Sequence, residues 1–440
     1  MSIMMAMSLF VGCGGNKDQD SAADNTADQP SKDTDEKAGE DKAPVEKDED
    51  KKPGKEVKLK WSTWGNAGEI ERFQQFTDDF NKRHKGEINA ELIPVPDQYD
   101  QKIMTQLASN TAPDLFYSGG ESIYKYVRDD RVLDLSEFMN NSETLKPDSI
   151  YENLYGSAKQ DGKIYGVTVD CNPMIMYYNT DLIKKAGAKT PQEYKDEGKW
   201  NWESFAELTR KVRSQTNKHG FIMDNWWAAT FPWILPKDKE MYVEEDGTYK
   251  TLIDQPEMAE GINFIVDLIK EKAVTYSGSL PKGQGSDAMF MSGQVAMVAA
   301  GRWYVPMFKK IKNFEWDIIS YPDRPDGETV VGIPIAYFVI NKDTKYPQQA
   351  FTFLEEFCNK DGQYFRLQGS GNAIPSYKDD ELDKVVEEGN VVPLAEQMSP
   401  EAAKAQQDGL DLIWLLKDDP EKGLKNITEK VNAEFAKVKK

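Results

Sequence analysis

The feature that most constrains the fold is a regular alternation of strand-like and helix-like runs that begins at Val57. Residues 57–61 alternate apolar and charged side chains, as a half-buried strand does. Helical spacing of apolar residues follows at 70–80, then a strand at 90–95, a helix around 103–107 and a strand at 114–117. This order predicts a βαβαβ unit, and therefore an α/β protein built on mainly parallel sheets.

Further amphipathic helices are predicted along the rest of the chain. Asn201 is expected to cap one of them, because its side chain can accept from the first free backbone N–H groups. Pro347 suits the first turn of another helix. A stripe of apolar residues at helical spacing, from Leu424 to Val438, predicts a last helix. We interpret these stripes as core.

Composition excludes several classes of function. The chain has 440 residues, with 55 Lys+Arg against 75 Asp+Glu, so its formal net charge is −20. A nucleic-acid partner needs a basic surface, which this balance argues against. Two histidines and three cysteines lie far apart without metal-ligand spacing. No P-loop, Gly-x-Ser-x-Gly elbow or full dinucleotide fingerprint is present. We therefore expect no metal and no cofactor.

Aromatic residues lie next to turn residues at several places. Examples are Trp64 before Gly65, the Trp226–Trp227 pair after Asn225, and Trp303 after Gly301. A sugar has flat C–H faces ringed by hydroxyl groups, so its site needs aromatic plates and polar side chains. These residue types fit a sugar site, although an aromatic residue at a strand end also serves as ordinary core.

The first 55 residues form two segments. Residues 1–12 are largely apolar and have the length of a signal-peptide core. Leu9–Cys13 resembles a bacterial lipobox, with Phe10 where leucine is usual, and this resemblance implies that Cys13 carries a lipid anchor. Residues 13–55 are mostly charged or small, so we expect a disordered acidic tether. For Cys171 and Cys358 a disulfide is possible, but two buried free thiols are the favoured alternative.

Ordered phrases along the folded part resemble one family. They are Leu59–Gly65, Gln98–Lys102, Ala112–Phe116, Asp161–Val167, Met176–Leu182, Phe290–Met297, Gly301–Trp303 and Gly371–Pro375. In order and spacing this set is similar to the extracellular solute-binding proteins of ABC sugar importers, the maltose-binding-protein-like class. The resemblance covers nearly the whole folded chain.

The resemblance implies a two-lobed, type 2 periplasmic-binding-protein-like α/β fold, with a ligand cleft between the lobes. Lobe one would comprise residues 56–168 plus 334–370, and lobe two residues 169–333 plus 371–440. Hinge crossings are then expected near 165–170, near 331–334 and near 369–374. Pockets at domain interfaces and at the carboxyl ends of strands agree with this expectation.

The resemblance also implies a set of ligand-binding residues. From lobe one and the last crossing these are Trp64, Asn66, Glu69, Asp114, Tyr117, Ser118 and Tyr337. From lobe two they are Asp170, Asn172, Tyr178, Trp226, Arg302 and Trp303. No catalytic residue is expected.

Some of these assignments have alternatives. Asp114 is either a ligand contact or a local cap, and Arg302 either reaches the ligand or pairs with a surface acid. Tyr177 and Tyr178 alternate on a strand, so at most one of them faces the ligand. Trp226 is preferred over its neighbour Trp227.

The implied function is capture without chemistry. A lipoprotein on the extracellular face of the bacterial membrane would bind a sugar or oligosaccharide by lobe closure and deliver it to an ABC permease. We expect a monomer, held to the membrane through Cys13, that is not an enzyme. The alternatives are a lipid-anchored carbohydrate-active enzyme, or the same fold with a polyol, glycerol phosphate or peptide as cargo.

Overall fold

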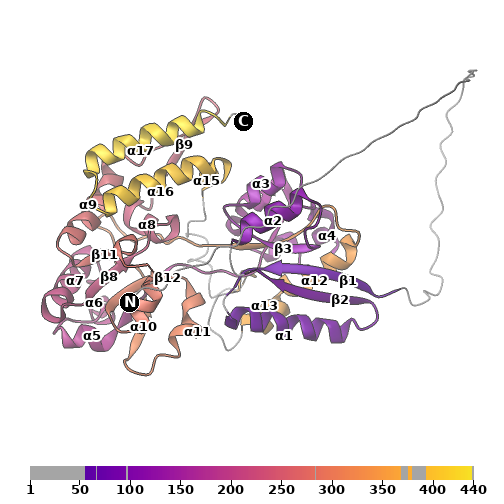
Figure 1. Cartoon of the computed structure of the whole chain (residues 1–440), viewed down its shortest axis with the longest axis horizontal. Coiled ribbons are helices and arrows are strands. Elements are labelled where there is room, and N and C mark those ends of the chain that lie inside the picture. Colours follow the sequence, from indigo (N-terminus) through magenta and orange to yellow (C-terminus); the bar gives the residue numbers. More distant parts are fainter. Residues whose placement is uncertain are drawn as a thin grey trace, which may run out of the picture. The chain divides into compact units, whose positions relative to one another are not determined.

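The computed structural model describes residues 55–65, 67–95, 98–282, 284–367, 375–378 and 393–438. The predicted leader, Cys13 and the tether up to residue 54 lie outside these described residues. The described part contains two five-stranded sheets, each covered by helices (Figure 1). We call the part built on the first sheet lobe one and the part built on the second sheet lobe two.

The first sheet has the strand order β2-β1-β3-β14-β6. Its strands are β1 (Val57–Thr63), β2 (Ile88–Pro94), β3 (Leu115–Gly119), β6 (Val167–Thr168) and β14 (Ala336–Ile340). Strand β1 runs parallel to both β2 and β3, whereas β14 runs antiparallel to β3 and β6. The carboxyl ends of β1 and β3 therefore lie at the same edge of the sheet.

Helices pack on both faces of this sheet. They are α1 (Ala67–Arg83), α2 (Tyr99–Ala108), α3 (Ile123–Arg128), α4 (Ser136–Asn141), α12 (Pro347–Cys358) and α13 (Lys360–Leu367). Short elements complete lobe one: the 3-10 turns η1 (Pro147–Ser149) and η2 (Glu152–Ala158) and the hairpin of β4 (Lys159–Gln160) and β5 (Lys163–Ile164).

The core of lobe one is aromatic. Trp61 of β1 is fully buried, and its ring centroid lies 5.6 Å from that of Phe353 and 5.4 Å from that of Phe357, both on α12. The predicted βαβαβ unit is confirmed as β1-α1-β2-α2-β3. Phe76 and Phe80, from the predicted stripe on α1, are buried against the same helix.

The second sheet has the order β11-β8-β12-β7-β13. Its strands are β7 (Ile175–Asn179), β8 (His219–Met223), β11 (Val274–Tyr276), β12 (Val295–Ala300) and β13 (Trp316–Ile319). Strands β11, β8 and β12 are parallel, and β7 is antiparallel to β12 and β13. Tyr177 and Tyr178 belong to separate buried clusters, as the alternation along β7 predicts.

Lobe two is rich in helices. They are α5 (Thr180–Lys185), α6 (Pro191–Asp196), α7 (Trp202–Thr216), α8 (Trp227–Ile234), α9 (Pro256–Lys270), α10 (Ser286–Met291), α11 (Val305–Phe308), α15 (Leu394–Met398), α16 (Pro400–Trp414) and α17 (Pro420–Phe435). The hairpin of β9 (Tyr242–Glu245) and β10 (Thr248–Thr251) and the turns η3 (Ser277–Ser279) and η4 (Arg302–Tyr304) complete it.

Local signals in the sequence place several of these helices correctly. Asn201 accepts from the backbone N–H of Ser204 and caps α7, as predicted. Pro347 is the first residue of α12. The predicted last helix is α17, which lies alongside α16 (Figure 1). It ends at Phe435, so Val438 lies beyond it.

The chain passes between the lobes from β6 to β7 and again from β13 to β14. The third predicted crossing, near residues 369–374, falls outside the described residues. Residues 375–378 were assigned to lobe two by the prediction, yet they pack on lobe one. Tyr377 forms a β-bridge with Ile150, and Ser376 donates to the carbonyl of Thr168 at 2.8 Å. The described part of the chain resumes at residue 393, immediately before α15.

Both cysteines in the described part, Cys171 and Cys358, are free and buried, which confirms the favoured alternative. Among the described helices, none is both long and apolar enough to cross a membrane. The described residues also contain no cluster of three or more His, Cys, Asp or Glu side chains that could hold a metal ion.

Helix α15 contacts both lobes and carries a buried acid. It packs against α3 and η2 of lobe one and against α16 of lobe two. Glu396 on α15 accepts from the hydroxyl of Tyr242 and from the side-chain amide of Gln406. Burial raises the pKa of Glu396 to about 7, the nearby Glu121 of lobe one adds to the rise, and the Tyr242 hydrogen bond opposes it.

This acid makes folding stability depend on pH. The folded pKa lies above that of an unfolded glutamate, so the folded state binds the proton more tightly. The contribution of protonated Glu396 to the free energy of unfolding is therefore lost as pH rises from about 4.5 to about 7. We expect Glu396→Gln to raise the free energy of unfolding at pH 8 by about 2–3 kcal/mol and to leave it unchanged at pH 4. Urea unfolding at the two pH values measures the difference.

The exposed Glu401 on α16 provides a matched control. Glu401→Gln should leave the free energy of unfolding within about 0.5 kcal/mol of the parent at both pH values. An equal response of the two variants at pH 8 would contradict the role assigned to Glu396.

Candidate functional site

Two adjoining cavities lie where strand ends of the two lobes come together. The larger has a volume of about 510 Å³ and the smaller about 320 Å³. Trp64, Pro334 and Ile335 line both of them, so the two cavities share one wall. Each volume is within the range of small-molecule sites.

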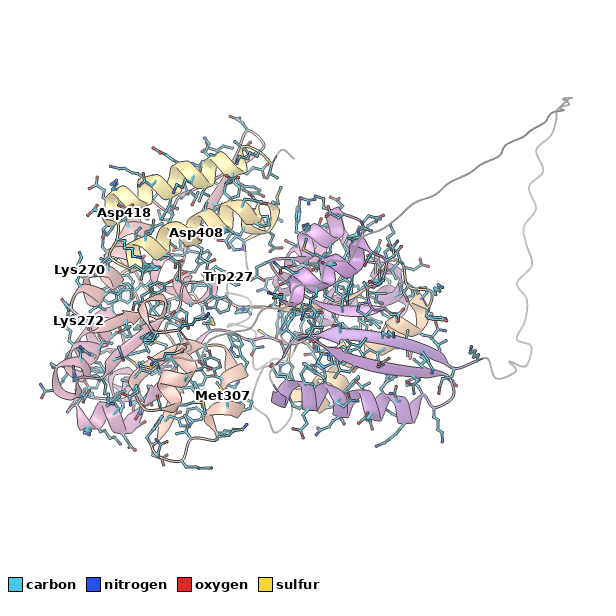
Figure 2. All side chains as sticks on the ribbon, viewed as in Figure 1. Trp227, Lys270, Lys272, Met307, Asp408 and Asp418 are labelled. Atoms are coloured by element: carbon cyan, nitrogen blue, oxygen red, sulfur yellow. The ribbon has the colours of Figure 1, made fainter. Side chains whose placement is uncertain are left out.

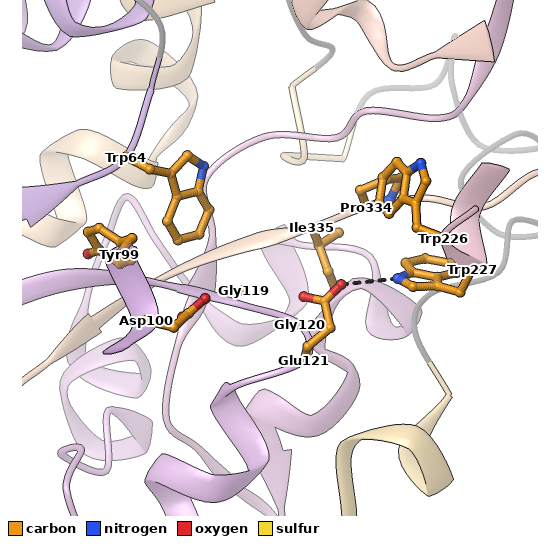
Figure 3. A pocket seen from close by; sticks show the side chains of 10 residues that line it. All are labelled: Trp64, Tyr99, Asp100, Gly119, Gly120, Glu121, Trp226, Trp227, Pro334 and Ile335. Carbon is orange, nitrogen blue, oxygen red and sulfur yellow. Dashed lines mark hydrogen bonds between the residues drawn. The ribbon is translucent and has the colours of Figure 1, made fainter. Parts of the chain in front are cut away.

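Both lobes contribute to each cavity. The larger is lined by Trp64, Gly65, Glu69, Phe73, Tyr117, Val169, Asp170, Asn172, Asp287, Trp303, Tyr304, Met307, Pro334, Ile335 and Ala336. The smaller is lined by Trp64, Tyr99, Asp100, Gly119, Gly120, Glu121, Trp226, Trp227, Pro334 and Ile335. Figure 2 marks Met307 of the larger cavity and Trp227 of the smaller one, and Figure 3 shows the smaller cavity.

Trp64 is held in place by its neighbours in lobe one. It follows directly after β1, and Gly65 has a φ of +151°, a conformation that favours glycine. The indole contacts the rings of Tyr99 and Tyr117 edge to face, with centroids 5.0 and 5.4 Å away. The Tyr99 hydroxyl in turn donates to the carbonyl of Ser62 at 3.0 Å. These contacts present Trp64 as a fixed aromatic wall.

Trp303 is positioned by a close approach to the backbone. It lies in η4, just after β12, and a Cβ on Gly301 would come within 1.9 Å of its ring. Glycine at 301 is therefore required for the indole to lie over the chain. The hydroxyl of the buried Tyr177 donates to the carbonyl of Gly301 at 2.8 Å and holds this turn in place.

Two further tryptophans extend the aromatic surface of lobe two. Trp227 is the first residue of α8 and Trp226 is its N-cap, and their ring centroids are 6.0 Å apart. The Trp226 centroid lies 6.3 Å from that of Trp303. The indole N–H of Trp227 donates to a carboxylate oxygen of Glu121 in lobe one at 3.1 Å (Figure 3). This hydrogen bond joins the two lobes at the cavity wall.

The floor of the larger cavity is polar and charged. Asn172 donates to Asp170 at 3.0 Å, and Arg366, Arg72 and Glu69 act electrostatically on the same carboxylate. Burial raises the pKa of Asp170 to about 6, Arg366 opposes this rise, and Glu69 adds to it. A buried carboxylate with neighbouring amide and guanidinium groups can bind hydroxyl or ammonium groups of a ligand.

Many of the predicted ligand-binding residues lie around these cavities. Those in the lining are Trp64, Glu69, Tyr117, Asp170, Asn172, Trp226 and Trp303. Nothing tests their contact with a ligand, so that role stays a prediction. Asn66 and Cys13 lie outside the described residues.

Five predicted residues lie in neither lining. Asp114 accepts from the backbone N–H of Lys60 and from the hydroxyl of Thr344, which lie 54 and 230 residues away, so these contacts tie together distant segments and are not a local cap. Tyr337 is fully buried and donates to the carbonyl of Tyr155 at 2.7 Å.

The other three are Ser118, Tyr178 and Arg302. Ser118 is buried in β3 and donates to the carbonyl of Gly119 at 3.2 Å. Tyr178 packs in the core of lobe two, and Arg302 precedes Trp303 without reaching either cavity lining. Ser118 and Tyr178 are buried within their sheets, whereas Arg302 begins the turn η4.

Sequence reasoning missed several residues that line the cavities. The polar ones are Tyr99, Asp100, Glu121, Asp287 and Tyr304. Trp227 was considered and Trp226 preferred, yet both line the smaller cavity. The position of Glu121 just after a predicted strand could have signalled it. Asp287 on α10 offers no such signal.

Comparison with known proteins identifies a family. The family model described as bacterial extracellular solute-binding protein matches residues 75–391 of this chain. An arabinooligosaccharide-binding protein of Bacillus subtilis is 21% identical over 68% of this chain and 69% of its own length. The maltodextrin-binding protein MdxE of the same species is 27% identical over 49% of this chain and 51% of its own length.

Solved structures confirm the predicted two-lobed fold. The ABC substrate-binding protein Lmo0181 of Listeria monocytogenes, solved in complex with cycloalternan, has a TM-score of 0.76 and 20% identity. That match covers 86% of this chain and 99% of the other. The GacH receptor of Streptomyces glaucescens has a TM-score of 0.74 and 16% identity, covering 87% of this chain and 100% of the receptor.

Proposed function

We propose, because the chain belongs to the bacterial extracellular solute-binding proteins, that it captures a sugar or oligosaccharide outside the cell for an ABC transporter. The relatives named above support this cargo, since they bind arabinooligosaccharide and maltodextrin. The proposed partner is the transmembrane part of an ABC permease, which receives the loaded protein.

One observation carries the proposal: tryptophans from both lobes border the two cavities that share a wall. Trp64 belongs to lobe one, whereas Trp226, Trp227 and Trp303 belong to lobe two. Indole faces match the C–H faces of a pyranose, and the polar lining offers partners for its hydroxyl groups. A chain of sugar rings could occupy both cavities, because Trp64 borders each of them.

In the proposed mechanism, ligand binding shifts a population between open and closed lobes. A ligand that contacts both lobes stabilises the closed arrangement by its differential affinity for that state. The hydrogen bond from the indole N–H of Trp227 to the carboxylate of Glu121 would then form only in the closed arrangement. Micromolar binding requires about 8 kcal/mol, which stacked rings and several hydrogen bonds can supply.

The test combines binding, shape and chemistry on the same samples. Thermal shift with neutral mono- and oligosaccharides should identify a stabilising sugar, and small-angle scattering should then show a smaller radius of gyration at saturation. Product analysis after prolonged incubation should recover the sugar unchanged. Scattering that stays the same with every stabilising sugar contradicts lobe closure, and cleaved glycosidic bonds contradict capture without chemistry.

We further propose that Cys13 carries a lipid that holds the protein at the extracellular face of the membrane. The resemblance of Leu9–Cys13 to a lipobox supports this anchor. Mass spectrometry of the protein expressed in a bacterium should find an acylated N-terminal Cys13, and Cys13→Ser should release the protein into the medium. An unmodified Cys13 in a membrane-bound protein would exclude the anchor.

A further inference from the structure

We propose, building on the sugar-capturing function above, that the cargo is an amine-bearing saccharide with positive charge. The cavities are lined by carboxylates from both lobes. Glu69, Asp170 and Asp287 line the larger cavity, and Asp100 and Glu121 line the smaller one. Among the described residues in the two linings there is no lysine, arginine or histidine.

Two of these carboxylates have cationic neighbours behind the cavity wall. Arg366 and Arg72 both act electrostatically on Asp170, and Arg72 also interacts with Glu69. Arg366 is 1% exposed and donates to the carbonyls of Val169 and Phe357. Two positive charges therefore offset Glu69 and Asp170.

The other three carboxylates have no such compensation. Asp100 accepts from the hydroxyl of Ser122 at 3.1 Å, and Glu121 accepts from the indole of Trp227. Both donors are neutral. Within the described part of the chain, neither these two acids nor Asp287 forms an ion pair. An uncompensated negative potential at a concave surface attracts a cation.

Buried polar atoms in the larger cavity provide a second, independent observation. The side chain of Asn172 is 8% exposed and that of Tyr117 is 3% exposed, and both line the cavity. Asn172 Oδ1 and the Tyr117 hydroxyl have no hydrogen-bond partner among the described residues. Buried polar groups are normally satisfied, so these two atoms require a polar partner that the described residues do not supply, and a bound ligand can provide it. An ammonium group can only donate hydrogen bonds, so it suits the acceptor atom Asn172 Oδ1.

The aromatic walls favour the same cargo. Trp64, Trp226 and Trp303 line the cavities, and aromatic rings can attract cations as well as the C–H faces of a sugar. Figure 3 shows the carboxylates of Asp100 and Glu121 among the tryptophans of the smaller cavity. A phosphate or carboxylate on the ligand would instead meet like charge, which argues against an anionic cargo such as glycerol phosphate.

Calorimetry on the full chain with isosteric sugar pairs tests this inference. The probes are D-glucosamine and its β-1,4-linked oligomers against D-glucose and the cello-oligosaccharides, which carry a hydroxyl where the others carry an ammonium group. Oligomers of glucuronic acid supply the anionic arm. We expect the amine to bind at least tenfold more tightly than its neutral counterpart in 50 mM salt, a smaller gap in 500 mM salt, and no binding of the acid.

Substitutions locate the effect. Asp287→Asn should weaken binding of the amine at least fivefold more than binding of any neutral sugar. Asp408 on the surface of α16, which pairs with Lys404, is the matched control, and Asp408→Asn should change neither affinity. Figure 2 shows Asp408 on that helix.

The outcomes separate this inference from the proposed function. Neutral sugars that bind as tightly as the amines, or that bind when no amine does, overturn the cationic cargo and leave sugar capture intact. Tighter binding of the acid overturns the cationic cargo as well. If no saccharide of any charge binds, both the cargo and the proposed function fail.

Discussion

Replacing Trp64 with alanine is expected to weaken binding of the captured sugar by about 30- to 150-fold. The indole borders both cavities, so its loss removes a stacking surface from each of them. Burying an aromatic ring against a ligand contributes about 2–3 kcal/mol, and each 1.4 kcal/mol is a tenfold change in affinity. Isothermal titration calorimetry with the tightest-binding sugar measures the loss. Trp64→Phe should recover part of the affinity, because it keeps an aromatic face.

The matched control removes the same ring from a position outside the cavities. Trp316 on β13 is partly buried against Tyr177 and Phe308 and lines neither cavity. Trp316→Ala should lower the thermal midpoint while it changes the affinity less than threefold. If both variants lose affinity equally, the effect of Trp64 is a general loss of structure, and Trp64 is not part of the binding surface.

Most of the fold of lobe one could be predicted because its signals are local. The stripe on α1 repeats at helical spacing, and β1 alternates in the sequence. Such patterns depend only on neighbouring residues. The position of residues 375–378 could not be predicted in this way, because Tyr377 pairs with Ile150 more than two hundred residues earlier. No local pattern encodes that bridge.

The candidate site likewise contains residues that local sequence patterns predict and residues that they do not. Trp64 directly follows β1 and Trp303 comes three residues after the end of β12. The carboxyl ends of parallel strands gather at one edge of each sheet, so the placement of both residues at the cavities could be predicted. Tyr337 is predicted as a ligand contact from its place near the last crossing, but the register of β14 directs its hydroxyl to the carbonyl of Tyr155 and it lines neither cavity. Strand register depends on pairing, which one sequence does not reveal.

The acidic residues illustrate a different limit. The chain contains 75 Asp and Glu residues, so no single acid stands out from the sequence. Asp100, Glu121 and Asp287 lie on separate elements and meet around the cavities only through the tertiary fold. Their convergence gives the site a charge that composition alone cannot assign to any place on the molecule.

Arg366→Ala is expected to lower the free energy of unfolding of lobe one by about 3–5 kcal/mol. Its guanidinium group donates to the carbonyl of Val169 at 2.7 Å and to the carbonyl of Phe357 at 3.0 Å. It also lies 3.8 Å above the ring of Phe357. These contacts join α12 and α13 to the segment through which the chain enters lobe two. Truncation leaves two buried carbonyls without their donor and Asp170 without a cationic neighbour.

Urea unfolding, monitored by tryptophan fluorescence, measures the loss of stability. Two further variants test whether the loss is specific to the buried guanidinium group. Arg366→Lys keeps the charge but cannot form the forked contacts, so it should lie between the parent and the alanine variant. Arg210, whose exposed side chain pairs with Glu271, is the surface control, and Arg210→Ala should cost less than about 1 kcal/mol. A loss at Arg366 no larger than that at Arg210 would show that the buried guanidinium is not what holds the crossing segment to lobe one.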